Sequence, residues 1–188
     1  MDAYFEVKAL PSAEILQFEV ISHLIGQLHL HLPQFDGTIG LGFPGYGQER
    51  SLGGILRLLG PGEPIETLHH TLTQNPDVAD YALITPPDNI PNSIRSHLRY
   101  QRQHAKGSSR LRRLKKRQLA AGIWSDEKEK RIIEKYAQPL TLPHAKLQSR
   151  STGQPFSLFI KQHSLNNPHP GKFNHYGLSL GEATIPKF

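Results

Sequence analysis

Several features are missing from the sequence, and each absence excludes a class of protein. The 188 residues include no cysteine, which excludes disulfide bonds, zinc ribbons and catalysis by a thiol. No apolar run approaches the roughly 18 residues that cross a membrane, and residues 1–4 show no signal-peptide pattern. The histidines and carboxylates are not spaced as metal ligands. We therefore expect a cytoplasmic protein that needs no membrane, metal ion or other cofactor.

Negative charge is missing from the most basic part of the chain. Residues 95–117 contain ten of the 22 Lys and Arg residues and no Asp or Glu, although the net charge of the whole chain is only +6. At helical spacing Arg110, Arg113 and Arg117 fall on one face. The residues that widen this face are Arg112, Lys115 and Lys116.

This basic helix, residues 110–117, is not explained by stability, because its like charges repel one another. Its simplest partner is the regular array of phosphates in a nucleic acid. A solvated charged helix is the alternative, but solvated faces usually mix charges of both signs. We therefore predict that the basic helix binds nucleic acid.

The amino-terminal part of the chain shows strand and helix patterns in a regular order. Alternating and short apolar runs predict strands over residues 3–9, 38–43, 54–59 and 78–84. Helical spacing predicts helices over residues 12–32, with Ser12 as the N-cap, and over 63–74. The resulting β-α-β-β-α-β order is typical of the ferredoxin-like arrangement. We predict an α+β protein whose residues 1–88 form a ferredoxin-like domain.

A second, smaller domain is predicted after a proline-rich linker over residues 85–92. It contains the basic helix, then a helix that begins at Ser125 and ends near Tyr136. Strands are expected over residues 147–151 and 156–161, on either side of a Ser-Thr-Gly-Gln turn. We predict that residues 93–188 form an irregular α/β domain with an Arg-rich helix.

One of the 11 histidines, His29, stands out by its position. It lies on the flank of the apolar stripe near the end of the first helix, from which it can reach a groove beside the sheet. A structural histidine stabilised by the helix dipole is the alternative. Histidine is suited to proton transfer at neutral pH. The ribose 2′-hydroxyl can attack its own phosphate, so cleavage of RNA without a metal ion is open to such a chain.

Two sequence blocks follow the basic helix. Residues 149–156 have the pattern Ser-x-Ser-Thr-Gly-Gln-x-Phe, and residues 176–181 have the pattern Tyr-Gly-Leu-Ser-x-Gly. Together with His29 and the basic helix, these blocks resemble the CRISPR-associated repeat-RNA endoribonuclease of type I-F systems, the Csy-type branch of the repeat-processing family. The resemblance covers essentially the whole chain.

The resemblance implies an activity and partners. The family cuts a CRISPR repeat at the base of a short RNA hairpin, needs no metal ion and leaves a 2′,3′-cyclic phosphate. It tends to remain on the hairpin of the mature guide RNA. This chain is therefore expected to be a subunit of the type I-F surveillance complex.

The resemblance also implies roles for individual residues. His29 ends the matching Leu-x-Gly-x-Leu-His segment and is expected to be the general base. Ser149 is expected to hold the 2′-hydroxyl, with Ser151 as the less favoured neighbour. Tyr176 is expected to orient His29, and Phe156 to stack on the closing base pair of the stem.

The family's arginine helix, which lies in the RNA major groove, matches the basic helix of this chain. This match makes Arg113 and Arg117 the best contacts to phosphate or guanine, and Arg102 a linker residue that reads a base edge. The further expected RNA contacts are His104, Arg110, Arg112 and Lys116. His104 stands where the family often has Gln, so we expect base recognition there to differ or to be lost.

Two other functions compete with the endoribonuclease. The chain could be a non-catalytic hairpin-binding module of the same fold, in which His29 is only structural. It could also be a ribosome- or DNA-associated basic protein, which would bind duplex DNA equally well and without sequence preference. The joint presence of His29, Ser149 and Tyr176 favours the enzyme.

Overall fold

The computed structural model describes residues 1–104, 108–125, 127, 129–131 and 140–188. Helices and strands are mixed and the strands pair antiparallel, which confirms the predicted α+β class. Contacts divide the chain into two compact units, residues 1–103 with 142–188, and residues 104–141. Compact units defined by contacts do not establish which parts fold independently, so the predicted domains, residues 1–88 and 93–188, stay a prediction.

The first sheet of the larger unit has the strand order β2-β3-β1-β4, and the two-residue strand β5 also pairs with β1. In chain order these strands are β1 (Ala3–Ala9), β2 (Gly40–Gly42), β3 (Ile55–Gly60), β4 (Ala82–Ile84) and β5 (Asp88–Asn89). β1 lies between β3 and β4 and is antiparallel to both. The first four strands thus come in the order and arrangement that the ferredoxin-like pattern predicts.

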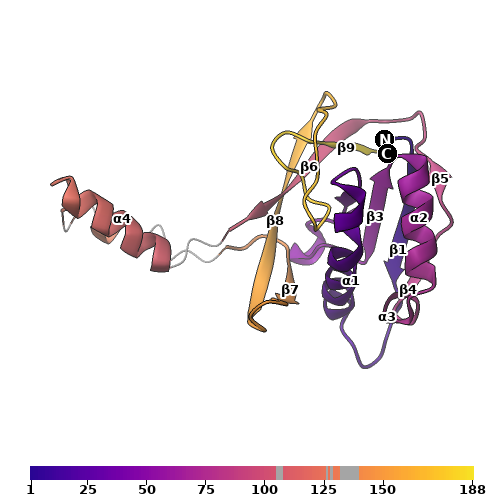
Figure 1. Cartoon of the computed structure of the whole chain (residues 1–188), viewed down its shortest axis with the longest axis horizontal. Coiled ribbons are helices and arrows are strands. Elements are labelled where there is room, and N and C mark those ends of the chain that lie inside the picture. Colours follow the sequence, from indigo (N-terminus) through magenta and orange to yellow (C-terminus); the bar gives the residue numbers. More distant parts are fainter. Residues whose placement is uncertain (105–107, 126, 128, 132–139) are drawn as a thin grey trace. The chain divides into compact units, whose positions relative to one another are not determined.

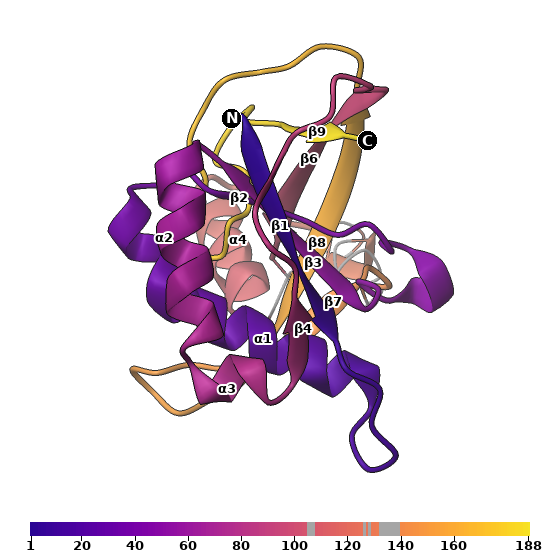
Figure 2. The same ribbon diagram turned by 90° about the vertical axis from the view of Figure 1, so that its right-hand side faces the viewer.

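Two helices, α1 (Gln17–His31) and α2 (Gly62–Thr73), cover one face of this sheet (Figures 1 and 2). Alternate residues of β1, including Phe5, point to this face and are fully buried, because the strand has a side-chain period of two. The buried helix residues that meet them include Leu24 and Leu68. The short helical turns η1 (Leu32–Phe35) and α3 (Pro76–Ala79) contact these helices, and a third turn, η2 (Gln48–Arg50), lies between β2 and β3 in the sequence.

A second sheet in the same unit has the order β7-β8-β6-β9. Its strands are β6 (Ser96–Gln103), β7 (His144–Gln148), β8 (Pro155–Leu165) and β9 (Ile185–Lys187). Tyrosine hydroxyls join the two sheets. Tyr100 donates to the Phe43 carbonyl at 3.2 Å, and Tyr46 donates to the Ile160 carbonyl at 2.8 Å.

Arg57, on the other face of the first sheet, connects the two sheets through Phe188, which follows β9. The Arg57 guanidinium lies 2.7 Å from the Glu6 carboxylate and stacks over the Phe188 ring, with 4.3 Å to its centre. Burial alone would raise the pKa of the Glu6 carboxyl, but hydrogen bonds from Arg57 and Lys8 hold this pKa below its ordinary value. The pair is therefore ionised at neutral pH.

The start of the first helix differs from the sequence prediction. Ser12 does not cap α1, because its Oγ accepts from the backbone N–H groups of Glu14 and Ile15, both at 3.2 Å, and closes a separate turn. The helix begins five residues later, at Gln17. There the Glu19 carboxylate accepts from the backbone N–H of Leu16 at 3.3 Å.

Two further elements differ from the sequence prediction. Residues 78 and 79, predicted to begin the strand over residues 78–84, belong to α3, because Asn75 caps this helix by accepting from the Asp77 N–H at 3.0 Å. No strand was predicted between residues 93 and 117, but residues 96–103 form β6. The polar residues His97, Arg99 and Gln101 alternate with buried Leu98 and Tyr100, which is a strand pattern.

The smaller unit contains the predicted basic helix, α4 (Ser108–Ala120). The helix expected from Ser125 to Tyr136 is described only in part. Residues 127 and 129–131 are helical, and the Glu129 N–H donates to the Ser125 carbonyl at 2.9 Å. The other predicted residues of this helix lie outside the described part of the chain.

A long segment between β8 and β9 returns across both sheets, and its residues 172–180 form what we call the site loop. The Phe173 N–H donates to the Gly37 carbonyl at 2.9 Å, and the Gly177 carbonyl accepts from Leu41 at 2.8 Å. The Ser179 N–H donates to the Tyr100 carbonyl at 2.8 Å. The site loop is thus held to β2 on one side and to β6 on the other.

Gly177 is the position at which the site loop comes closest to β2. Its φ is +71°, and an added Cβ would lie 2.6 Å from the Leu41 Cβ.

We expect Gly177→Ala to lower the free energy of unfolding by about 2–4 kcal/mol, because it adds overpacking to left-handed strain. Gly181→Ala is the matched control. Its φ is +61° with nothing within 4 Å, so only the strain of about 1–2 kcal/mol applies. Urea unfolding measures both, and equal losses would contradict the close approach.

Candidate active site

His29 lies in the last turn of α1, where the helix changes from core to surface. The buried residues Ile25, Leu28 and Leu32 follow one another at spacings of three and four, so they share the face that packs on the sheet. His29 falls beside this face and is half-buried. The helix therefore presents the imidazole at the edge of the core, as the sequence predicted.

The site loop forms a tight turn next to His29. The Asn174 side-chain oxygen accepts from the backbone N–H groups of Tyr176 at 2.8 Å and Leu178 at 3.1 Å. The Gly177 N–H donates back to the Asn174 carbonyl at 2.8 Å. Leu178 is fully buried and anchors the turn. These bonds fix the direction of the His175 carbonyl and of the Tyr176 ring.

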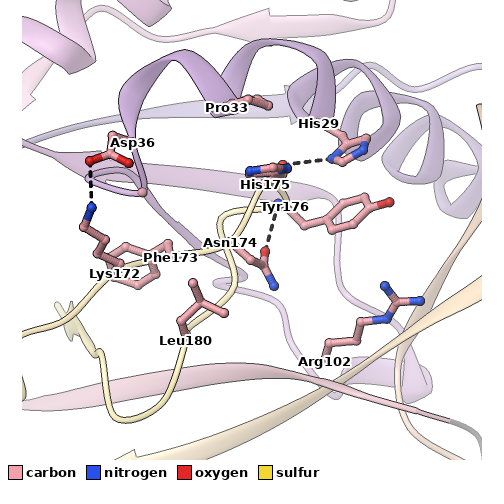
Figure 3. A pocket seen from close by; sticks show the side chains of 11 residues that line it. His29, Pro33, Asp36, Arg102, Lys172, Phe173, Asn174, His175, Tyr176 and Leu180 are labelled. Atoms are coloured by element: carbon pink, nitrogen blue, oxygen red, sulfur yellow. Dashed lines mark hydrogen bonds and ion pairs between the residues drawn. The ribbon is translucent and has the colours of Figure 1, made fainter.

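Two contacts from this turn orient the His29 imidazole (Figure 3). The His29 Nδ1 lies 3.1 Å from the His175 carbonyl oxygen. The His29 and Tyr176 rings are stacked, with 4.1 Å between their centres and 7° between their planes. A carbonyl oxygen only accepts, so Nδ1 must carry the proton. In the neutral imidazole Nε2 is then unprotonated and free to accept a proton.

A cavity of about 350 Å³ opens beside His29 and Tyr176, and its lining also includes His175, Arg102 and Lys172 (Figure 3). Arg102 is exposed and has no ion-pair partner within the described part of the chain. Lys172 lies 2.6 Å from Asp36, and its hydrogen bond and charge hold the pKa of that carboxyl below the ordinary value. The cavity thus combines an imidazole with cations, which suits a phosphate group.

Ser149 and Ser151 lie outside this cavity, in the turn between β7 and β8. The Ser149 N–H donates to the Gln154 carbonyl at 2.9 Å, and its carbonyl accepts from Gly153 at 2.7 Å. The two serine Oγ atoms are 3.2 Å apart. The structure therefore brings His29 and Tyr176 together but does not place either serine among the residues that line their cavity.

β7 nevertheless runs along α1 and connects the serine turn to the helix that carries His29. The Lys146 N–H donates to the Ser22 Oγ at 3.0 Å. Leu147 lies next to Gly26, since a Cβ added to this glycine would be 3.9 Å from the Leu147 Cδ2. Ser22 and Gly26 lie about two turns and one turn, respectively, before His29 on the same helix. The serine turn is thus fixed relative to His29 by the packing of β7 on α1.

Arg102 links the cavity to Phe156. It comes from the end of β6 and lines the His29 cavity, while its guanidinium carbon lies 5.5 Å from the centre of the Phe156 ring. This distance allows a cation–π contact. Phe156 is half-buried at the start of β8. The predicted stacking residue and the predicted base-reading residue are therefore neighbours.

The other predicted RNA contacts belong to the smaller unit. Arg113, Lys116 and Arg117 are exposed on α4. Arg110 and Arg112 also lie on α4, but their side chains are outside the described part of the structure. Lys115, in contrast, pairs with Glu129 at 2.5 Å, and this pair and the Trp124 N–H hold the pKa of the glutamate below its ordinary value. His104 is exposed and begins the smaller unit.

The sequence alone missed three features of the site: the His175 carbonyl, the Asn174 side chain and Lys172. His175 had no recognisable ligand spacing, and a backbone contact leaves no pattern in the sequence. Its place next to Tyr176 was the one signal that could have pointed to it. Among the described residues, no group of three or more His, Asp or Glu could hold a metal ion.

The fold and the site together define a class of protein, an α+β chain with an oriented histidine in a basic cavity and a separate basic helix. The family model described as "CRISPR-associated protein (Cas_Csy4)" matches residues 4–188. The chain therefore belongs to the Cas_Csy4 family. In the described part of the chain we find no helix that combines the length and the apolar character needed to cross a bilayer.

Two curated relatives align over their whole length with the whole of this chain. One is the "CRISPR-associated endonuclease Cas6/Csy4" of Escherichia coli (strain UTI89 / UPEC), which is 31% identical over 191 residues. The other has the same name, comes from Pseudomonas aeruginosa (strain UCBPP-PA14) and is 32% identical over 192 residues. Both relatives are thus named as endonucleases.

Proposed function

We propose that this chain is a metal-independent endoribonuclease that cuts CRISPR repeat hairpins in precursor CRISPR RNA. The names of the relatives support an endonuclease of this kind. The observation that carries the proposal is the orientation of His29, whose Nδ1 is 3.1 Å from the His175 carbonyl. This contact leaves Nε2 free to accept a proton in a cavity lined by cations.

In the proposed reaction, the His29 Nε2 takes the proton of the ribose 2′-hydroxyl. The 2′-oxygen attacks the neighbouring phosphorus, the bond from phosphorus to the 5′-oxygen breaks, and a 2′,3′-cyclic phosphate remains. Lys172 lines the cavity and stabilises the negative charge that develops on the phosphoryl oxygens. The stacked Tyr176 ring keeps the imidazole in its orientation.

Ser149 and Phe156 hold the RNA next to this cavity in our proposal. The Ser149 hydroxyl binds the ribose at the cleaved bond, while Ser151, 3.2 Å from it, orients that hydroxyl. Phe156 stacks on the last base pair of the stem, a contact typically worth about 1–3 kcal/mol. Arg102, which contacts Phe156, then reads the edge of a base at the foot of the stem.

The smaller unit supplies the main affinity for the stem in this proposal. The exposed cations Arg113, Lys116 and Arg117 contact phosphates or guanine edges, and Arg110, Arg112 and His104 extend this surface. Such contacts persist after cleavage, because the hairpin itself is not changed. We therefore propose that the protein stays on the mature guide RNA in the cytoplasm, as a subunit of the type I-F surveillance complex.

A cleavage assay in EDTA tests the chemistry. We expect the protein to cut a type I-F repeat hairpin once, and to leave uncut the same RNA with a single 2′-deoxy sugar at the cut, since that sugar lacks the nucleophile. Both RNAs should bind equally well, as measured by filter binding. Tight binding of both RNAs without cleavage of either would support the non-catalytic module instead. Cleavage of the deoxy RNA would exclude 2′-hydroxyl attack.

Removing two charges from α4 tests the RNA-binding role of the smaller unit. We expect Arg113→Ala with Arg117→Ala to weaken hairpin binding and to reduce the slope of log affinity against log salt by about 2, roughly 1 for each lost phosphate contact. Lys130→Ala with Arg131→Ala is the matched control, because it removes the same charge from exposed positions of the same unit. Equal effects of the two double variants would contradict a specific role for α4.

A further inference from the structure

We propose that His175 is a second catalytic histidine, which gives a proton to the departing 5′-oxygen. This inference rests on the proposed cleavage reaction. A 5′-alkoxide is a poor leaving group, so the reaction needs a proton donor as well as a base. In an in-line displacement the attacking and leaving oxygens lie on opposite sides of phosphorus. A group beside His29, and not His29 itself, is therefore best placed to act as the acid.

Three groups besides His29 line the cavity and carry a proton that they could give up: Lys172, Tyr176 and His175. The Lys172 ammonium is paired with the Asp36 carboxylate at 2.6 Å, so it is already engaged as a hydrogen-bond donor to that group. The Tyr176 ring is stacked on the ring of His29, the proposed base, and so lies on the side of the phosphorus where the base acts. His175 is exposed, and its ring nitrogens have no hydrogen-bond partner among the described residues.

The spacing of the two imidazoles fits one phosphate. Their ring centres are 6.2 Å apart and their planes meet at 37° (Figure 3). Both rings can therefore come within the ~2.6–3.2 Å of a hydrogen bond from different oxygens of the same phosphodiester. An imidazole is also the side chain that most readily gives or takes a proton near neutral pH.

One residue thus serves both proton transfers in this account. The His175 carbonyl holds Nδ1 of the base, and the His175 side chain is the acid. As the bond from phosphorus to the 5′-oxygen breaks, the protonated His175 gives its proton to that oxygen. His29 has meanwhile gained the proton of the 2′-hydroxyl. Exchange with water then returns both imidazoles to their starting states, so no other reactant is needed.

A substrate with a sulfur leaving group distinguishes a general acid from a residue that has only a structural role. An RNA hairpin with sulfur in place of the 5′-oxygen at the cut releases a thiolate, which leaves without a proton. In single-turnover assays at saturating protein, we expect His175→Gln to slow cleavage of the ordinary hairpin about 100-fold or more, the usual range for general acid catalysis. We expect the same variant to cut the sulfur hairpin within a few-fold of the unsubstituted protein. His29→Gln should slow both reactions.

Two controls keep the outcomes distinct. His70→Gln, on an exposed position of α2 outside the cavity, should leave both rates unchanged. His175→Gln keeps the backbone carbonyl, and it should bind the 2′-deoxy hairpin as tightly as the unsubstituted protein does. Equal slowing of both hairpins by His175→Gln, or no slowing of either, would overturn the assignment of His175 alone. Failure of the unsubstituted protein to cut the ordinary hairpin would overturn the proposed function itself.

Discussion

The hydrogen bond from His29 Nδ1 to the His175 carbonyl is the contact on which the proposed chemistry of this protein depends. At 3.1 Å it selects one tautomer of the imidazole, because the carbonyl can only accept. The stacked Tyr176 ring then limits the rotation of the same imidazole. A histidine with a fixed tautomer and a fixed plane presents Nε2 in one direction, and this is what a general base requires.

The rest of the fold serves to bring these two distant parts of the chain together. His29 is placed by α1, whose apolar face packs on the first sheet. His175 is placed by the site loop, which is bonded to β2 through Gly177 and to β6 through Ser179. The sheets in turn are joined by tyrosine hydroxyls and by Arg57, which contacts Phe188. Stability of the fold and geometry of the site therefore depend on the same contacts.

Periodicity in the sequence predicted the α+β class, the first strand and the basic helix, because each buries or exposes a regular face. It failed where local hydrogen bonds compete with periodicity: Ser12 closes its own turn, and Asn75 caps a short helix in a predicted strand. Resemblance to a family pointed to His29 and Tyr176, which the structure places in contact. Neither route could find the His175 carbonyl, because any residue type supplies the same backbone oxygen.

The tautomer of His29 is the most direct measure of this account. Long-range nitrogen–proton NMR of histidine-labelled protein, with His29 assigned by comparison with the His29→Gln spectrum, reports which ring nitrogen carries the proton in the neutral imidazole. The account predicts a proton on Nδ1 and none on Nε2, since Nδ1 donates to the His175 carbonyl. A proton on Nε2, with Nδ1 bare, would contradict it, because His29 could not then act as the base in the geometry described.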